Sequence, residues 1–138
     1  MGVVLDTSVL IAAERGAVRL EALLESLGEE TVAVAAITAS ELLHGCHRAG
    51  DAGVRARRSA FVDALLDALP VLPFGLPEAR RHAELWAELA RTGTVIGPHD
   101  LLMAATALAH GFVLATLNQR EFGRVPGLRF AAVEPYLP

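Results

Sequence analysis

The chain alternates between short apolar runs and longer segments in which apolar residues recur at helical spacing. The apolar runs predict buried strands at 3–5, 31–37 and 112–116, with two shorter strands at 71–74 and 129–133. Helical spacing, with Gly and Pro near the segment ends, predicts helices over 9–15, 18–27, 38–49, 54–69, 78–91 and 99–110. Strands that lack polar alternation and are separated by helices are typical of a parallel sheet covered on both faces. We therefore predict a three-layer α/β/α domain.

Acidic and hydroxyl side chains gather where the expected strands end and the next helices begin. Asp6, Thr7 and Ser8 directly follow the first strand. Glu41 lies early in the helix after the second strand, and Asp100 lies at the start of the last helix. In an open parallel sheet, ligands bind at the edge formed by the carboxyl ends of the strands. We therefore expect the three acids to converge on one site.

Each acid also has a purely structural explanation. Asp6 is placed to cap the helix that follows it. Thr38 and Glu41 have the spacing of a capping box. Asp100, two residues after Pro98, would suit the positive end of the helix dipole. These roles do not explain why all three acids stand at strand ends or at the start of sheet-packing helices.

The functional explanation rests on coordination chemistry. Hard divalent cations such as Mg²⁺ and Mn²⁺ prefer carboxylate oxygens as ligands. Such a cation activates water and offsets the charge that builds on a phosphoryl group. A cluster of acids would repel itself strongly without a cation. The three acids therefore indicate a metal-dependent hydrolase.

Composition favours one globular domain. The chain has 138 residues, of which 53% are hydrophobic and 20% are charged, so we expect a single domain over 1–138. The single cysteine, Cys46, excludes an internal disulfide. No apolar run approaches the roughly 18 residues that span a bilayer, and no basic segment precedes the first apolar run. We expect no membrane contact and a cytoplasmic location.

Charge excludes a broad basic binding face. The formal net charge is −4, which argues against a generic nucleic-acid-binding surface. Apart from Asp6, Glu41, Asp100 and Glu121, twelve acids balance twelve basic residues, all of them Arg. A divalent metal held by the four acids would reverse the local potential and let a polyanion approach.

Four segments together resemble a PIN domain, most closely the VapC-type toxins of bacterial toxin–antitoxin pairs. They are Val-Leu-Asp-Thr-Ser at 4–8, Ser-Glu-Leu-Leu-His-Gly at 40–45, Ile-Gly-Pro-His-Asp-Leu-Leu-Met-Ala-Ala-Thr-Ala-Leu-Ala at 96–109 and Ala-Thr-Leu-Asn-Gln-Arg-Glu-Phe-Gly-Arg-Val-Pro-Gly-Leu at 115–128. The resemblance implies an endoribonuclease dependent on Mg²⁺ or Mn²⁺, with Asp6, Glu41 and Asp100 as its acidic cluster. It also implies a five-stranded parallel sheet, an RNA substrate, a cognate antitoxin and a homodimer.

The chain departs from that family at the fourth acid. Many members have Asp where this chain has Asn118, and Glu121 is the nearest substitute. We include Glu121 with Asp6, Glu41 and Asp100 as a candidate catalytic residue. Whether Asn118 or Glu121 takes the place of the family's fourth acid stays open. Thr7, Ser8 and Thr116 are candidates for hydrogen bonds around the metal or a phosphate, unless they only satisfy helix and strand ends. Arg120 is a candidate contact to RNA phosphate.

Two other functions remain open from the residues alone. In a non-catalytic protein-interaction module, the acids would only cap helices, and the apolar helices 54–69 and 78–91 would serve association. In a structure-specific DNA nuclease, the same acids would cut DNA. The chain has no evident clamp for threading a DNA end, which favours RNA.

Overall fold

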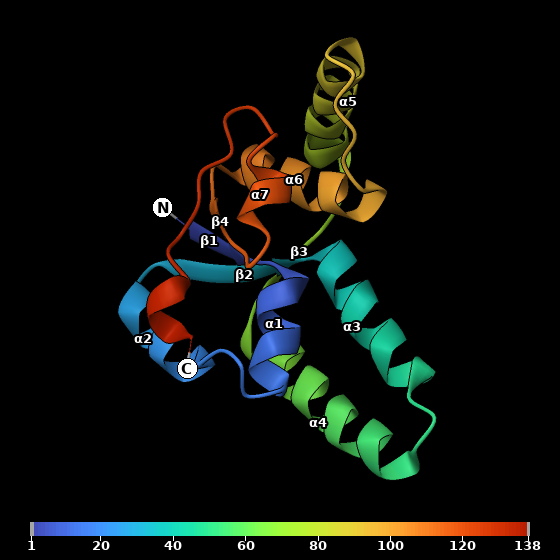
Figure 1. Ribbon diagram of the computed structural model, residues 1–138, viewed down its shortest axis with the longest axis vertical. Coiled ribbons are helices and arrows are strands. Elements are labelled where there is room, and N and C mark those ends of the chain that lie inside the picture. Colours follow the sequence, from blue (N-terminus) through green and yellow to red (C-terminus); the bar gives the residue numbers. More distant parts are fainter. Residues whose placement is uncertain (1, 138) are drawn as a thin grey trace.

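The computed structural model describes residues 2–137, which form a parallel sheet in the order β3-β2-β1-β4 with helices on both faces (Figure 1). The strands are β1 (Gly2–Leu5), β2 (Thr31–Ala35), β3 (Val71–Leu72) and β4 (Val113–Ala115). The helices are α1 (Thr7–Glu14), α2 (Leu20–Leu27), α3 (Ala36–Arg48), α4 (Ala52–Ala68), α5 (Leu76–Arg91), α6 (Pro98–His110) and α7 (Gln119–Phe122), followed by a 3₁₀ helix, η1 (Glu134–Tyr136).

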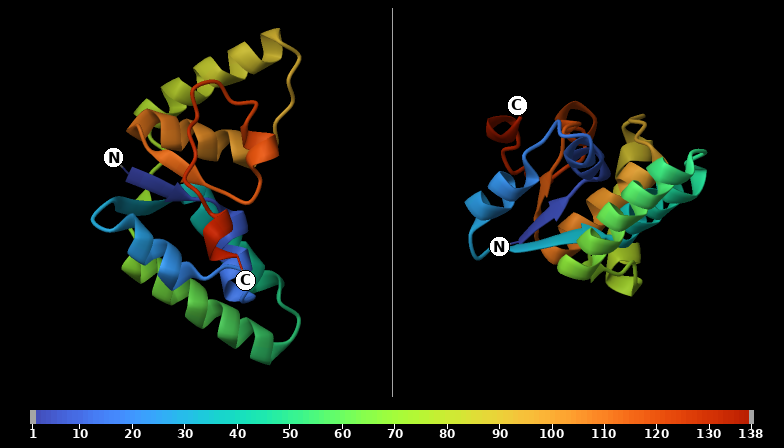
Figure 2. Two further views of the ribbon diagram at one scale, coloured as in Figure 1. Left: turned by 60° about the vertical axis from the view of Figure 1, so that its left-hand side comes forward. Right: turned by 90° about the horizontal axis from the view of Figure 1, so that it is seen from below.

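Side chains of β1 alternate between two hydrophobic cores, one on each face of the sheet. Val3 and Leu5 pack in a core with residues of α1, α2, α3 and α4. Val4 packs in the other core with residues of α5 and α6. Figure 2 shows the two helical layers on opposite sides of the strands. The predicted three-layer α/β/α architecture is confirmed.

The expected fifth strand is absent from the described residues. Segment 129–133 makes a single bridge, between Phe130 and Leu114 of β4, with two backbone hydrogen bonds. The chain then leaves the sheet to form η1, whose Tyr136 carbonyl accepts a 2.8 Å hydrogen bond from the Arg19 amide. Docking of η1 beside α2 therefore ends the pairing after one bridge, and the sheet has four strands among these residues.

Helix α6 is buried nearly all round because most of its residues are small or apolar. It ends at Gly111, whose φ of 68° lies in the left-handed region that Gly adopts without strain, as the sequence predicts for a helix C-cap. The turn leads directly into β4 and fixes the position of that strand beside β1. Among residues 2–137, no helix combines the length and apolarity needed to cross a membrane.

The order of the strands determines where a site can form. The chain places β2 and β3 successively on one side of β1 and then returns to add β4 on the other side. The carboxyl ends of β1 and β4 therefore flank a topological switch point, where ligands bind in open α/β sheets. Asp6 follows β1 at this point, and Thr116 follows β4.

Candidate active site

Asp6 lies at the switch point with its side chain turned into the site. The residue is only 4% exposed and occupies the N-cap position of α1, yet its side chain makes no capping hydrogen bond. Instead, Asp6 Oδ2 accepts hydrogen bonds from Ser8 Oγ at 2.6 Å and Thr116 Oγ1 at 2.7 Å. The capping explanation for Asp6 is therefore wrong, and among the described residues Oδ1 is left for a ligand.

The loop after β4 orients both hydroxyls that hold Asp6. The Asn118 amide donates to Thr116 Oγ1 at 2.9 Å, and the Leu117 amide donates to Ser8 Oγ at 3.1 Å. Each hydroxyl accepts from the backbone and therefore points its own proton at the carboxylate. The position of Asp6 is thus determined by residues from two separate strand ends.

Glu41 reaches the site from α3. Thr7 Oγ1 donates to Glu41 Oε1 at 2.7 Å and lies 3.1 Å from the Thr38 hydroxyl. Because α3 begins at Ala36, directly after β2, Thr38 lies inside the helix and cannot be its N-cap. The capping-box explanation for Thr38 and Glu41 is therefore wrong. The early helix start turns both side chains toward α1.

Asp100 is the third residue of α6 and is partly buried. Its pKa is raised to about 6, first by burial and then by repulsion from the carboxylates of Asp6, Glu41 and Glu121. The structure therefore brings four acids from different parts of the chain into one electrostatic environment. This convergence is what the strand-end pattern predicts.

The donor set fits a hard divalent cation. The carboxylates of Asp6, Glu41 and Glu121 repel that of Asp100, and a bound cation would relieve this repulsion. Carboxylate oxygens are also the ligands that Mg²⁺ and Mn²⁺ prefer. Within residues 2–137, no three acidic, His or Cys side chains already form a ready-made metal-binding group. Asp6 and Glu41 are instead held by hydroxyls, so a cation would have to draw the carboxylates together.

Residues of the short helix α7 lie at the edge of the acidic cluster. Glu121 contributes to the raised pKa of Asp100, and its Oε2 lies 3.4 Å from Arg124 Nη2. Asn118 is the N-cap of α7 but its side chain makes no capping bond. Asn118 and Arg120 are both exposed. Glu121 therefore acts electrostatically on Asp100, whereas Asn118 shows no such contribution to the raised pKa.

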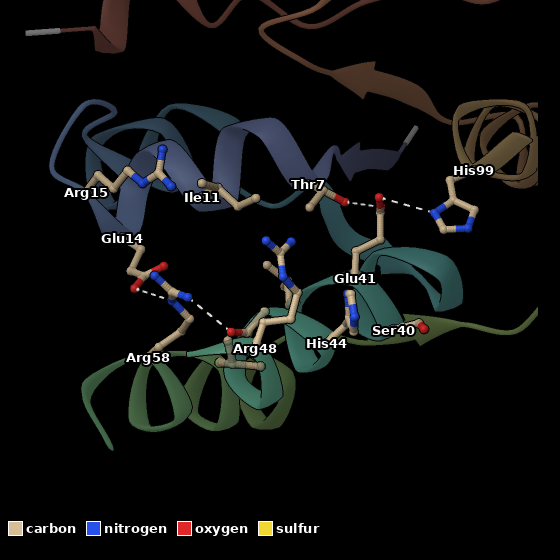
Figure 3. A pocket seen from close by; sticks show the side chains of 13 residues that line it. Thr7, Ile11, Glu14, Arg15, Ser40, Glu41, His44, Arg48, Arg58 and His99 are labelled. Atoms are coloured by element: carbon tan, nitrogen blue, oxygen red, sulfur yellow. Dashed lines mark hydrogen bonds and ion pairs between the residues drawn. The ribbon is translucent and has the colours of Figure 1, made fainter. Parts of the chain in front are cut away.

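A cavity of about 470 Å³ opens beside Glu41, between α1 and α3, and reaches α4 (Figure 3). His99 closes one end, with Nδ1 3.5 Å from Glu41 Oε2. Arg15, Arg48 and Arg58 lie toward the other end. The sequence analysis did not identify His99 as a site residue, because its contact is with Glu41 on α3, far from it along the chain. It also missed the arginines, although Arg48 follows Glu41 by seven residues and so shares its helix face.

Comparison with known proteins identifies the family of this chain. Residues 3–128 match the PIN domain family. Ribonuclease VapC1 of Rickettsia felis is 36% identical over 133 residues, which cover 96% of this chain and 97% of that protein. The tRNA(fMet)-specific endonuclease VapC of Salmonella typhimurium is 35% identical over 104 residues, covering 75% of this chain and 76% of that protein.

Solved structures are similar over nearly the whole chain. The crystal structure of DNA-bound VapBC from Salmonella typhimurium superposes with a TM-score of 0.86 at 30% identity, covering 95% of this chain and 97% of that one. VapBC2 from Rickettsia felis, bound to a DNA fragment from the promoter, gives a TM-score of 0.87 at 28% identity, covering 95% and 98%. Both are toxin–antitoxin complexes, and both share the fold described above.

Proposed function

This chain belongs to the PIN-domain family as a VapC-type ribonuclease toxin, and we propose that Asp6, Glu41, Asp100 and Glu121 are its catalytic carboxylates. The observation that supports this assignment is the raised pKa of Asp100, which is caused first by burial and then by repulsion from the other three carboxylates. If each acid only capped its own helix, the charges of Asp6, Glu41 and Glu121 would not need to lie close enough to affect Asp100. The carboxylates therefore act as a unit rather than as separate capping groups.

PIN-domain ribonucleases are metal-dependent as a class, and we propose Mg²⁺ or Mn²⁺ here, held by Asp6, Glu41 and Asp100. When bound, the cation supplies the Lewis acidity that activates water and offsets charge on the phosphoryl group. Ser8 and Thr116 fix Asp6 Oδ2 and leave Oδ1 for the ligand. Thr7 fixes Glu41 Oε1 in the same way. The three hydroxyls thus orient the carboxylates of Asp6 and Glu41 before RNA arrives.

The proposed substrate is RNA, cut at a phosphodiester by water without a covalent intermediate. Two named relatives are a ribonuclease and a tRNA-specific endonuclease, which supports RNA rather than DNA. The partner is an antitoxin protein, as in the VapBC complexes that share this fold. We propose that all of 1–138 is one PIN domain and that it acts in the cytoplasm, where its RNA substrates are found.

A homodimer is also proposed, through the apolar groove between α5 and α6. Trp86 is 64% exposed and Val95 is 77% exposed, and both line this groove of about 420 Å³. Trp86 and Leu89 are three residues apart on α5, but only Leu89 is buried. In the proposed dimer, Trp86 of one copy would enter the groove of the second copy across a two-fold axis.

The decisive test is cleavage of a panel of transfer RNAs, ribosomal RNA fragments and DNA strands of the same sequences. Wild type should cut RNA with Mg²⁺ or Mn²⁺ and not with EDTA. The Asp6→Asn and Asp100→Asn variants should be inactive but folded, while Asp67→Asn, an exposed acid on α4, should keep full activity. Unchanged turnover in either site variant would contradict the assignment. A protein that cuts nothing and gains no thermal stability with Mn²⁺ would be a binding module instead.

A further inference from the structure

The cavity beside Glu41 changes charge along its length (Figure 3). At one end Glu41 accepts from Thr7 and faces His99. At the other end Arg58 is neutralised, since its Nε lies 3.3 Å from Glu14 Oε1 and its Nη1 donates to the Gly45 carbonyl at 3.1 Å. The acidic end and the basic end therefore belong to one continuous cavity.

Arg15 and Arg48 carry the uncompensated charge in this cavity. Neither side chain makes an ion pair or hydrogen bond with the part of the chain that the structure describes. Figure 3 shows the Arg48 side chain reaching into the space between α1 and α3. Both side chains are exposed, so their guanidinium groups are accessible to a ligand that brings negative charge to that end of the cavity.

The spacing of the two ends follows from helix geometry. Arg48 lies seven residues beyond Glu41 on α3, which is about 10 Å along the helix axis. Arg15 lies eight residues beyond Thr7 at the end of α1, about 12 Å along that axis. Both walls therefore present polar site groups at one end and a guanidinium at a similar distance beyond them. A ligand that fits must carry negative charge at the arginine end, and it can carry negative charge at the Glu41 end only where the proposed cation offsets the carboxylates.

We infer that Arg15 and Arg48 bind a backbone phosphate of the RNA next to the phosphate that is cleaved, so that the substrate runs along the cavity between α1 and α3. A polynucleotide is the ligand that repeats one negative group along its length, and guanidinium groups hold phosphate oxygens with paired hydrogen bonds. The inference rests on the ribonuclease function proposed above. It explains how a polyanion is held by a protein without a basic face.

The test is RNA binding by the folded, non-cleaving Asp100→Asn protein. The probe is a short single-stranded RNA that wild type cuts, and the dissociation constant is measured over a range of salt concentrations. Adding Arg15→Gln and Arg48→Gln should weaken binding roughly tenfold at low salt, as expected for loss of a charge-assisted contact. The slope of log affinity against log salt should fall by about 0.7, the value for one phosphate contact on a single strand.

Two further variants separate a specific contact from a general charge effect. Arg57→Gln removes the same charge from an exposed position on α4 outside the cavity, so it should leave affinity and salt slope close to those of the parent. Arg48→Lys keeps the charge but not the paired hydrogen bonds, so it should restore the salt slope and only part of the affinity. Circular dichroism and melting temperature confirm that each variant is folded.

Different results would overturn this inference without touching the function. If Arg15→Gln and Arg48→Gln together leave RNA affinity unchanged in the Asp100→Asn protein, and leave KM unchanged when introduced into wild type, Arg15 and Arg48 do not hold substrate. If the double variant keeps RNA binding but escapes inhibition by its antitoxin, the cavity holds the protein partner instead. Failure of wild type to cut any RNA with metal present would instead refute the proposed function itself.

Discussion

Thr116 donates a 2.7 Å hydrogen bond to Asp6, and this bond joins the ends of the two strands that flank the switch point of the sheet. Thr116 is itself held by the Asn118 amide, so the acceptor and donor roles of its hydroxyl are fixed. The side chain of Asp6 is therefore oriented by the strand that enters the sheet last. Completion of the site requires that β4 be in place.

Replacement of Thr116 by Val should therefore damage stability and metal binding together. A buried carboxylate that loses a hydroxyl donor should lower the free energy of unfolding by about 1–3 kcal/mol. Chemical denaturation measures this loss, and the Mn²⁺ concentration for half of the melting-temperature shift should rise. Thr106→Val is the matched control, because Thr106 is equally buried but donates only to the Leu102 carbonyl within α6. Equal effects of the two changes on Mn²⁺ binding would contradict this role for Thr116.

The raised pKa of Asp100 makes the metal-free protein less stable as pH rises. Its ordinary pKa of 3.8 is raised to about 6 by burial and the nearby acids, so the folded state holds this proton more tightly than the unfolded chain does. Stability is therefore lost as pH rises from about 4 through 6, and the full penalty applies above that range. In EDTA, Asp100→Asn should melt several degrees above wild type at pH 8, and the difference should shrink toward pH 4.

Two controls test whether the cause is the acidic cluster. Asp67→Asn, outside the site, should show no such pH-dependent difference. Mg²⁺ or Mn²⁺ should raise the melting temperature of wild type more at pH 8 than at pH 5, because a cation relieves the repulsion among ionised carboxylates. A difference between wild type and Asp100→Asn that does not change with pH would rule out this explanation.

Asn118 and Glu121 differ in how they can complete the acidic cluster. An amide oxygen is a weaker ligand than a carboxylate for a hard cation, so Asn118→Asp should tighten Mn²⁺ binding in a melting-temperature titration. Glu121→Gln should weaken it, because Glu121 already acts on Asp100. Arg124→Gln removes the ion-pair partner of Glu121 and provides a control for that contact. If neither Asn118→Asp nor Glu121→Gln changes the titration, α7 takes no part in metal binding.

Trp86 should determine the oligomeric state. Removal of the largest exposed side chain in the α5–α6 groove by Trp86→Ser should convert a dimer into a monomer, as measured by light scattering across a concentration series. Leu117→Ser removes another exposed apolar side chain, far along the chain and outside the groove, and should leave the dimer intact. A wild type that is monomeric at all concentrations would refute the proposed dimer.

The periodicity of the sequence predicts the element order and the meeting of the acids because both follow from short-range patterns. Apolar runs mark β1, β2 and β4, and a parallel sheet brings their carboxyl ends to one edge. The position of Asp6 at that edge therefore follows from the pattern without any knowledge of side-chain contacts. The pattern of residues alone does not distinguish a ribonuclease from a DNA nuclease or a binding module, and the resemblance to the PIN domain favours the ribonuclease.

Features that depend on packing between distant segments are not predicted. Strand β2 ends at Ala35 and α3 begins at Ala36, with no Gly, Pro or side-chain cap at this junction. The sequence therefore carries no local signal that the helix starts two residues before Thr38. Segment 129–133 has strand-like composition, but docking of η1 on α2 takes the chain away from the sheet. Helical spacing identifies the faces of α5, but only the position of α6 determines that Leu89 is covered and Trp86 is not.

The absence of a loop between β2 and α3 makes this junction intolerant of changes in length. One residue inserted between Ala35 and Ala36 would rotate every side chain of α3 by about 100°, because an α-helix has 3.6 residues per turn. Glu41 would turn away from Thr7, and Arg48 would leave the cavity with it. The connection between α3 and α4, in contrast, can be lengthened at the exposed Gly50 without moving either residue. An insertion between Ala35 and Ala36 should therefore abolish the ribonuclease activity even though all the acidic residues are still present.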